Sequence, residues 1–318
     1  MLSVLLFGVV GGGGSGHPTA ADTAGNEAFW AAVPRTDADR ALLANRARHI
    51  DVCALISRDA LSHVGAVHAV DNTSPSTCAA HLGSAEEDKG TSVRWAGHIS
   101  PKPFEGNGTR QSVGVVNYLY TADRDHLPAD QADKLVQRSC TATARFASGA
   151  TLMMNIDAPL GTEPCPIAQR LLPDAMRKWT TEPAQGTSPD TVRTVLLDGD
   201  PCAVLTKLGT AASQVTRNLW ECEFHYHDQD VTLTYQYEQQ QIVTSDSTSI
   251  RDGSHTIYRP NPGPTPDEYV VYNSPVGTAI KTETPTDYMG PYVPNLNVSA
   301  KSGVVAEDVM RQALSLFP

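Results

Sequence analysis

Residues 50–57 read Ile50-Asp51-Val52-Cys53-Ala54-Leu55-Ile56-Ser57, and residues 199–206 read Gly199-Asp200-Pro201-Cys202-Ala203-Val204-Leu205-Thr206. Both stretches contain an Asp, a Cys-Ala pair two positions later, and two apolar residues directly after it. Each is followed by a short helical pattern and then by another cysteine, Cys78 or Cys222. Such internal similarity indicates that one structural unit is present twice in the chain.

Two β-rich runs follow the opening stretch in each copy. They cover residues 78–82 and 92–99 in the first copy, and residues 220–227 and 231–237 in the second. In the last run Val231, Leu233, Tyr235 and Tyr237 alternate with polar residues, as expected for a strand with one buried face. We therefore predict an antiparallel hairpin in each copy.

The ends of the two copies also match. Residues 154–158 (Met-Asn-Ile-Asp-Ala) precede a predicted helix over residues 165–179, and residues 296–300 (Leu-Asn-Val-Ser-Ala) precede one over residues 304–317. Apolar residues recur at helical spacing in both helices, which predicts that each packs one face on a sheet. Pro173 is expected to kink or split the first of them. The predicted fold class is α+β, with two tandem copies of a small domain whose antiparallel sheet is flanked by helices.

These patterns give the domain boundaries. We assign residues 1–20 to a truncated export or anchor segment and a flexible spacer, residues 21–180 to the first repeat, residues 181–193 to a linker, and residues 194–318 to the second repeat. The first repeat is predicted to begin with a lead-in helix from Thr19 to Arg48, with Asp37 as its N-cap. The stretch from Ser245 to Asp267 reads as a long insertion in the second repeat.

The first residues are apolar but few. The run from Leu2 to Val10 is far shorter than the roughly 20 residues of a membrane-spanning helix, and it lacks a positively charged start. It is either the tail of an export or anchor segment or an ordinary apolar N-terminus. The Gly-rich spacer that follows favours the first interpretation, and with it an N-terminal membrane tether.

The duplication also predicts how the six cysteines pair. Cys53 and Cys78 correspond to Cys202 and Cys222, so each pair is expected to form a disulfide within its copy. Cys140 and Cys165 have no counterparts in the second copy, and their joint absence there is what a third bridge predicts. Three disulfides would indicate export to an oxidising compartment. The alternative is a cytosolic protein in which all six cysteines are reduced.

The Asp-Val/Pro-Cys-Ala-Leu/Val-Ile/Leu pattern resembles an uncharacterised family of actinobacterial exported proteins and lipoproteins. Members typically open with an Asp-Pro-Cys-Ala-Leu-Leu helix, and Glu163-Pro164-Cys165-Pro166-Ile167 is similar to the Pro-Cys start of their last helix. The resemblance covers most of residues 48–180 and, more loosely, residues 195–318. This chain departs from the family in its doubled unit, in Val52 and in the absence of a lipobox. The resemblance implies an extracytoplasmic location, either secreted or membrane-anchored. It implies no particular biochemical activity.

Composition and motifs exclude several functions. The net charge of −11 argues against nucleic acid as a partner, because that role requires a basic surface. Neither a Gly-x-Ser-x-Gly elbow nor a phosphate-binding loop occurs, so we expect no enzyme and no cofactor. His225 and His227 would share one face of a strand and are the candidate metal ligands, but a third ligand at a defined spacing is missing.

A binding role remains. Two similar domains joined by a short linker create a groove, where ligands are often bound. Trp95, Tyr288 and Tyr292 are the candidate ligand-binding residues, the two tyrosines because they flank a loop-like Gly-Pro stretch. We expect a non-enzymatic extracytoplasmic binding or accessory module of the actinobacterial cell envelope, whose partner is an envelope lipid, a peptide or a membrane protein. The alternatives are a metal-binding protein or metal-dependent hydrolase that uses His225 and His227, and a purely structural envelope protein.

Overall fold

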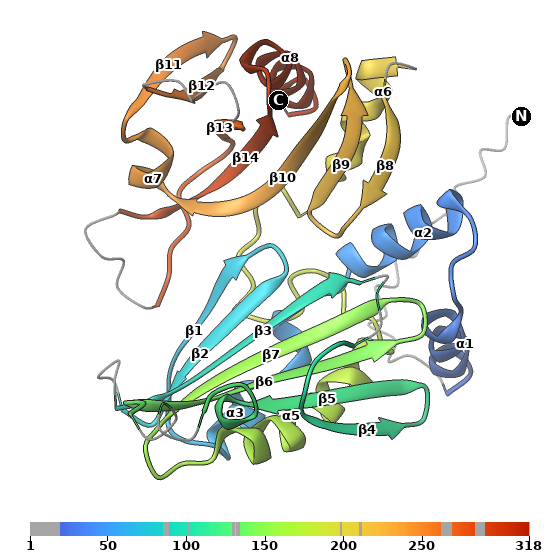
Figure 1. Ribbon diagram of the computed structural model, residues 1–318, viewed down its shortest axis with the longest axis vertical. Helices are drawn as coiled ribbons and strands as arrows, with labels where there is room; N and C mark the ends of the chain where they lie inside the picture. The colour runs from blue at the N-terminus through green and yellow to red at the C-terminus, as the bar shows by residue number, and fades with distance from the viewer. Residues whose placement is uncertain are drawn as a thin grey trace, which may run out of the picture.

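The computed structural model describes residues 20–84, 89–100, 102, 104–128, 131, 134–197, 199–209, 212–261, 269–283 and 290–317. It has two halves, each built on one antiparallel sheet (Figure 1). Most of the expected export segment, residues 1–19, lies outside the described residues. None of the helices described is both long and apolar enough to cross a bilayer.

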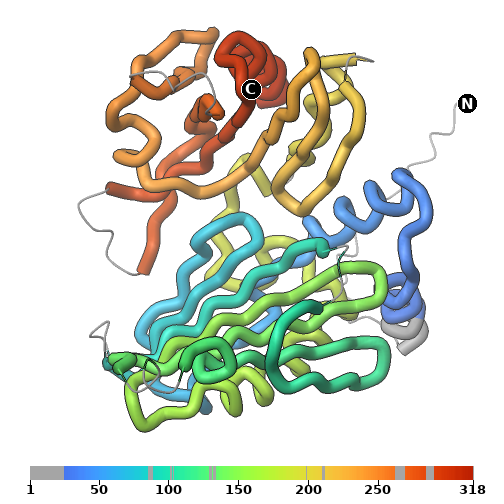
Figure 2. The backbone as a smooth tube through the Cα atoms, viewed as in Figure 1, coloured from blue at the N-terminus to red at the C-terminus, as the bar shows by residue number. Residues whose placement is uncertain are grey.

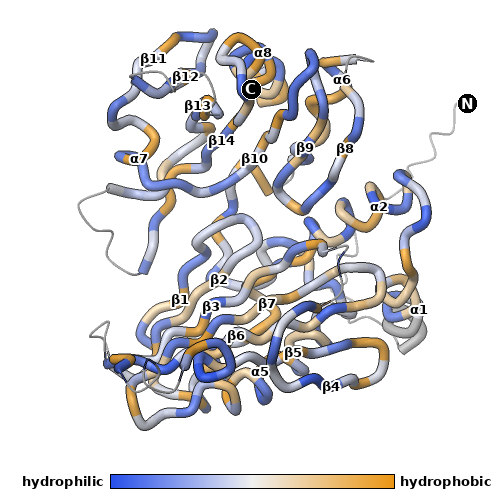
Figure 3. The backbone as a smooth tube through the Cα atoms, viewed as in Figure 1, coloured by the Kyte–Doolittle hydropathy of each residue, from blue (hydrophilic) through white to orange (hydrophobic). Residues whose placement is uncertain are grey.

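The first sheet contains seven strands in the spatial order β1-β2-β3-β7-β6-β5-β4. Their bounds are β1 (Val67–Ser74), β2 (Thr77–Leu82), β3 (Thr91–Ile99), β4 (Thr109–Val113), β5 (Val116–Ala122), β6 (Gln137–Phe146) and β7 (Ala150–Pro159). A 3₁₀ turn, η2 (Asp123–Asp125), follows β5. Buried and more exposed residues alternate along much of the central strands β6 and β7, so one face of the sheet is buried there (Figure 3), whereas edge strand β4 is exposed along its length.

The second sheet also contains seven strands, in the order β11-β12-β13-β14-β10-β9-β8. Their bounds are β8 (Ser213–Arg217), β9 (Glu221–Tyr226), β10 (Gln229–Gln239), β11 (Ser247–Asp252), β12 (His255–Pro260), β13 (Val270–Pro275) and β14 (Tyr292–Ala300). A short helix, α7 (Gln240–Thr244), connects β10 to β11.

Both sheets have one topology. Numbered within its own half, each follows the order 1-2-3-7-6-5-4, so the last strand inserts between the third and the sixth. The expected α+β class and duplicated architecture are confirmed. The expectation that Ser245 to Asp267 is an insertion is wrong, because β11 and β12 occupy the places of β4 and β5. β11 is an edge strand of the second sheet, and it lacks the alternating burial that makes a strand recognisable in a sequence.

Helices flank each sheet in the same order. The two matching opening stretches form the 3₁₀ turns η1 (Cys53–Leu55) and η3 (Pro201–Val204), followed by α3 (Arg58–Ser62) and α6 (Leu205–Leu208). The closing helices are α5 (Pro164–Trp179) and α8 (Gly303–Leu314), which pack on β6 and β7 and on β13 and β14. Their buried residues have the same spacing: Ile167, Ala168, Leu171, Leu172, Ala175 and Met176 in α5, and Val305, Ala306, Val309, Met310, Ala313 and Leu314 in α8. Helix α5 continues through Pro173.

The cysteines are joined as Cys53–Cys78, Cys140–Cys165 and Cys202–Cys222, the three pairs expected from the comparison of the copies. The first and third bridges occupy equivalent places, since each ties the 3₁₀ turn that opens its half to the second strand of the sheet. Cα–Cα distances of 5.1 to 5.3 Å suit disulfide geometry. Three disulfides indicate an extracytoplasmic protein.

The place of the remaining bridge is filled differently in the second half. Cys140 lies opposite Ile156, and Tyr272 lies opposite Val298, the residue that corresponds to Ile156. The burial pattern of the closing helices makes Gly303 the counterpart of Cys165. A Cβ on Gly303 would lie 3.2 Å from the Tyr272 hydroxyl. A buried tyrosine above a glycine therefore takes the position of the Cys140–Cys165 disulfide.

The lead-in segment forms two helices, α1 (Ala20–Ala31) and α2 (Asp37–Arg48), in place of the single expected helix. Figure 2 shows them along one side of the molecule, with α2 between the two halves. Pro34 interrupts the helix because proline disfavours helical geometry in the residue before it. The N-cap is Thr36 and not Asp37: the Thr36 hydroxyl accepts a hydrogen bond from Asp39 N at 3.1 Å, and Asp39 Oδ2 accepts from Thr36 N.

The segment assigned as a linker is packed against the first half. Ile50 and Ala184 form a β-bridge, and the buried Asp51 carboxylate accepts hydrogen bonds from Ser188 N and the Thr191 hydroxyl. Asp51 corresponds to Asp200 in the second copy, which pairs with Arg48 of α2. This aspartate of the repeat therefore binds the linker in the first copy and the lead-in helix in the second.

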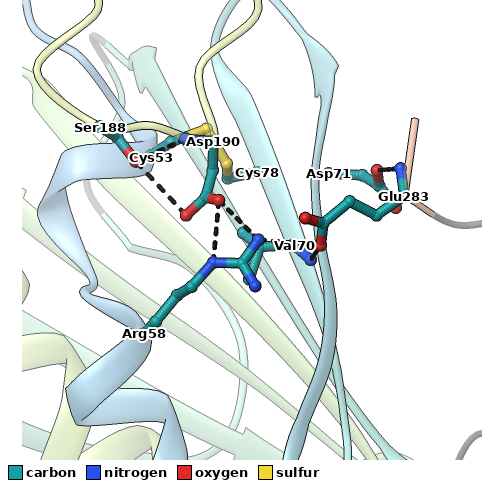
Figure 4. Close-up of polar contacts among 8 residues, drawn as sticks. All are labelled: Cys53, Arg58, Val70, Asp71, Cys78, Ser188, Asp190 and Glu283. Carbon is teal, nitrogen blue, oxygen red and sulfur yellow. Dashed lines mark hydrogen bonds and ion pairs between the residues drawn. A yellow bond between two sulfur atoms is a disulfide. The ribbon is translucent and has the colours of Figure 1, made fainter. Parts of the chain in front are cut away.

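A second contact joins the halves at the free edge of β1. Arg58 of α3 binds Asp190 Oδ1 at 2.6 Å and Glu283 Oε2 at 2.8 Å, so it bridges the linker and the second half (Figure 4). Glu283 Oε2 also accepts a hydrogen bond from Val70 N at 3.0 Å, and Glu283 N donates to Asp71 Oδ1. The edge strand is thereby covered by polar groups of the other half, which protects it from pairing with another chain.

Candidate functional site

The two histidines expected as metal ligands do not share a strand face. His225 lies in β9, with Nδ1 3.2 Å from Asp230 Oδ1. His227 lies beyond the strand, in the turn, where its φ of 48° breaks the alternation, and its ring packs 4.1 Å from that of Tyr226. Within the described ranges, no three His, Cys, Asp or Glu side chains come close enough together to hold a metal ion.

The aromatic candidates also lie apart. Trp95 is fully buried in β3 and donates from Nε1 to Val52 O at 2.8 Å, so it belongs to the core and not to a ligand surface. Tyr292 is half-buried at the start of β14, where its carbonyl accepts from Ile280 N, and it is therefore part of the sheet and not of a loop. Tyr288 lies outside the described residues.

A cleft of about 480 Å³ opens where the two halves meet the lead-in helices. It has more than twice the volume of the hollow of about 230 Å³ beside β4. Its wall has three parts: Val33, Pro34, Asp37, Arg40 and Leu43 from the lead-in segment; Ile99 of β3, Arg145 of β6, and Ala147 and Ser148 of the β6–β7 turn; and Val215, Thr216, Arg217 and Asn218 from β8 and the residue after it. The sequence predicts a groove between the copies, and the structure has one.

The lead-in wall of the cleft is fixed to the first half by Trp30. This side chain is fully buried, and its ring packs edge-on against Trp179 at 5.6 Å. Ser148 N donates to Trp30 O at 3.1 Å, so a cleft residue is itself tied to α1. Trp30 Nε1 donates to Glu182 Oε1, and Arg46 of α2 binds the same carboxylate. The cap at Thr36 then directs α2 across the cleft.

An ion pair joins the halves next to Arg217 of the cleft wall. Arg48, the last residue of α2, is 5% exposed and places Nη1 3.2 Å from Asp200 Oδ1. It also donates to Leu219 O at 3.4 Å. Burial lowers the pKa of Arg48, and the Asp200 carboxylate opposes this shift. Asp200 Oδ2 lies 3.9 Å from Arg217, so one carboxylate is shared by two guanidinium groups.

The cleft wall is rich in arginine. Arg40 pairs with Asp37, which also belongs to the wall, and both side chains are exposed. Arg145 is half-buried and donates from Nε to Ser100 O at 3.1 Å, and burial lowers the pKa of its guanidinium. Arginine remains charged in proteins even when its pKa falls, so the wall carries three positive charges against one carboxylate. Sequence reasoning missed these residues, since no motif joins three arginines from three distant segments.

Neither family models, nor curated proteins, nor solved structures give a match to this chain.

Proposed function

We propose that this chain is a non-enzymatic binding or accessory module on the extracytoplasmic side of an actinobacterial cell envelope, and that it holds its ligand in the cleft between the two halves. The cleft carries the proposal. Its volume of about 480 Å³ falls in the range of small-molecule sites, and it combines apolar walls with a few convergent polar groups.

Two further observations support the location and the absence of catalysis. Three disulfides are typical of proteins that fold in an oxidising compartment. The sequence resemblance to exported actinobacterial proteins supports the envelope. The cleft wall contains no histidine or cysteine and only one carboxylate, Asp37, so it offers few groups for acid–base or nucleophilic chemistry.

The alternatives have less support. A metal-dependent role needs His225 and His227 to converge on one ion, and the turn at His227 separates them. A purely structural role would leave the cleft without a ligand, and this can be tested directly.

The test fills the cleft from either side. Ala147→Trp adds bulk from the first half, and Thr216→Trp adds it from β8 of the second half; both residues are exposed. Ser249→Trp is the matched control, because Ser249 is exposed on β11 at the opposite edge of the second sheet. The full chain, purified with its disulfides oxidised, is titrated with phenylnaphthylamine, an uncharged apolar dye whose fluorescence rises when it leaves water.

We expect saturable binding by the wild type and by Ser249→Trp, and a loss of at least tenfold in affinity for both cleft variants, at unchanged melting temperature. Equal binding by all four proteins would show that the cleft is not the site, and it would favour the structural alternative.

A further inference from the structure

Strand β8 forms one wall of the cleft and turns its backbone edge toward it. β8 is the last strand of the second sheet, so no strand lies on its side away from β9 (Figure 1). Val215, Thr216 and Arg217 follow one another along β8, and all three line the cleft. Successive side chains of a strand point to opposite faces of the sheet, so consecutive residues line one cleft where the edge of the strand faces it. The cleft is therefore lined by backbone N–H and C=O groups as well as by side chains.

The register of the β8–β9 hairpin shows which backbone groups are free. Asn218 N donates to Glu221 O at 3.0 Å, and Arg217 lies opposite Cys222. Hydrogen-bonded and non-hydrogen-bonded pairs alternate in an antiparallel ladder, so the N–H and C=O groups of Arg217 point away from β9. Those of Val215, two residues earlier on the strand, point the same way. Within the described ranges, no backbone group outside the sheet is hydrogen-bonded to the backbone of either residue.

The equivalent edge of the first half is already occupied. β1 and β8 have the same place in their sheets. Counted from the disulfide cysteine of the neighbouring strand, Val70 of β1 corresponds to Val215 of β8. Val70 N donates to Glu283 Oε2 at 3.0 Å, so this edge of the first half binds a segment of the second half (Figure 4). The same edge of the repeat is bound to another chain segment in one copy and open to a cleft of about 480 Å³ in the other.

The wall opposite β8 is apolar in part. Leu43 of α2 and Ile99 at the end of β3 line it, and Val33 extends it to the rim with 65% of its surface exposed. Apolar side chains of a ligand would cover this surface and remove it from water. Arg40 is already paired with Asp37, and both belong to the wall. The cleft therefore suits a ligand with main-chain hydrogen-bonding groups and apolar side chains more than it suits an ion.

We propose that the cleft binds an extended peptide segment of a partner protein, which adds to the free edge of β8 as a further strand and places apolar side chains against Leu43 and Ile99. This assignment rests on the proposed function, whose ligand class it specifies. In strand addition the main-chain hydrogen bonds supply affinity, and pockets for alternate side chains supply specificity. A hydrocarbon ligand would make no use of the N–H groups of Val215 and Arg217.

The first experiment uses a fluorescein-labelled hexapeptide of alternating valine and threonine. It is titrated with the full chain, disulfides oxidised, and binding is followed by fluorescence anisotropy. Two N-methylated forms are compared with it, one methylated at every valine and the other at every threonine. In an added strand only one of these two sets of N–H groups faces β8. We expect methylation of that set to weaken binding at least tenfold and methylation of the other set to leave it nearly unchanged. Equal effects of both sets, or no saturable binding of the parent peptide, would overturn the inference.

The second experiment removes a donor from the protein. Arg217→Pro and Arg217→Ala both lack the guanidinium group, but only proline lacks the N–H that faces the cleft. Proline is tolerated on an edge strand where its nitrogen points outward. We expect Arg217→Pro to bind the peptide about tenfold more weakly than Arg217→Ala, the effect of one lost hydrogen bond. Ser249→Pro, on β11 at the opposite edge of the same sheet, is the control and should bind as the wild type does. Equal binding by the two Arg217 variants would overturn the inference, and the methylated peptides decide if Arg217→Pro does not fold.

Failure of this inference differs from failure of the proposed function. If Ala147→Trp and Thr216→Trp lose binding of phenylnaphthylamine but the two methylated peptides bind alike, the cleft is a binding site and an added strand is not its ligand. If the tryptophan variants bind the dye as the wild type does, the cleft site itself is wrong, and this inference falls with it.

Discussion

Tyr272 and Gly303 fill the place where the first half has its Cys140–Cys165 bridge. Tyr272 is 4% exposed, and the missing side chain of Gly303 leaves room for its hydroxyl. Because the two positions are equivalent to a pair whose Cα atoms are 5.2 Å apart, we predict that Tyr272→Cys with Gly303→Cys forms a fourth disulfide. Mass analysis of the alkylated, non-reduced protein detects the bridge.

The contribution of this disulfide to stability is measured by comparing the oxidised and reduced forms of the same double variant. We expect oxidation to stabilise it by about 4 kcal/mol in denaturant unfolding, the chain-entropy value for the loop closed between positions 272 and 303. The single variant Tyr272→Cys, which cannot form the bridge, reports the loss of the aromatic ring and should melt below the wild type. Two free thiols in the oxidised double variant would mean that the halves are not equivalent at this place.

Asp200 combines two roles that one substitution separates. Its Oδ1 accepts from Cys202 N and caps η3, and the same carboxylate pairs with the buried Arg48. Asn keeps the cap but removes the charge. We predict that Asp200→Asn destabilises the protein by about 2 kcal/mol in urea unfolding, because it leaves the buried Arg48 charge beside Arg217 without a carboxylate; partial exposure of Asp200 keeps the effect below that of a fully buried pair.

The control is Asp174→Asn, which breaks an exposed pair with Arg177 on the surface of α5. It should change stability by less than about 0.5 kcal/mol. A value for Asp200→Asn as small as that of the control would show that the Arg48 contact does not hold the halves together.

At the scale of elements, the edge hairpins β4–β5 and β11–β12 are the parts of the repeat least visible in the sequence. Both have two-residue turns that begin with a glycine of positive φ, Gly114 at 57° and Gly253 at 58°. Positive φ at the first turn position alone fits a type II′ turn, which glycine favours. Nothing lies within 4 Å of a Cβ on Gly253. We therefore predict that Gly253→Ala destabilises the protein by about 1 kcal/mol, through backbone strain alone.

The matched control is a glycine-to-alanine change with the opposite expected effect on stability. Gly25 also has open space around a Cβ, but it lies within α1 with helical φ, so Gly25→Ala should stabilise the protein by up to about 1 kcal/mol. Thermal unfolding of both variants checks the pair. Stabilisation by Gly253→Ala would contradict the turn assignment.

Sequence reasoning succeeded where burial is periodic. Strand β10 alternates along its length and α8 has one apolar stripe, so both are readable from residue order alone. It failed at β11, which has no buried face, and at the lead-in segment, where a single hydroxyl, that of Thr36, decides the start of α2. The helix N-cap was misplaced by one residue, as is usual for boundaries.

The candidate site was predictable only in outline. Duplication implies a groove between copies, and the groove is present. The arginines that line it, Arg40, Arg145 and Arg217, come from three segments far apart in the sequence, so only the packing of the halves brings them together. Conversely, the histidine pair at 225 and 227 looked like a metal site because strand periodicity was assumed to continue, and the turn ends it at Tyr226.

At the scale of the whole molecule, the contact made by Arg58, Asp190 and Glu283 makes the junction of the halves sensitive to pH (Figure 4). The hydrogen bond from Arg58, followed by that from Val70 N, lowers the pKa of Glu283 below its ordinary value of 4.5. A carboxyl group whose pKa is lowered by folding stabilises the folded state above its ordinary pKa, and this contribution is lost as pH falls through the lowered value. Acid should therefore weaken the junction at β1.

Glu283→Gln mimics the protonated side chain at every pH, which makes it the reference for this effect. We predict that the wild type melts above Glu283→Gln at pH 7, that the difference in melting temperature shrinks as pH falls below 4.5, and that it closes once pH falls below the lowered pKa of Glu283. Glu163→Gln is the control, because Glu163 pairs with Arg124 on an exposed surface within the first half, where ion pairs contribute little. A wild-type advantage that persists unchanged into acid would show that the Glu283 carboxylate does not stabilise the junction, and the contacts of Arg48 with Asp200 and Leu219 would then remain to hold the halves in register.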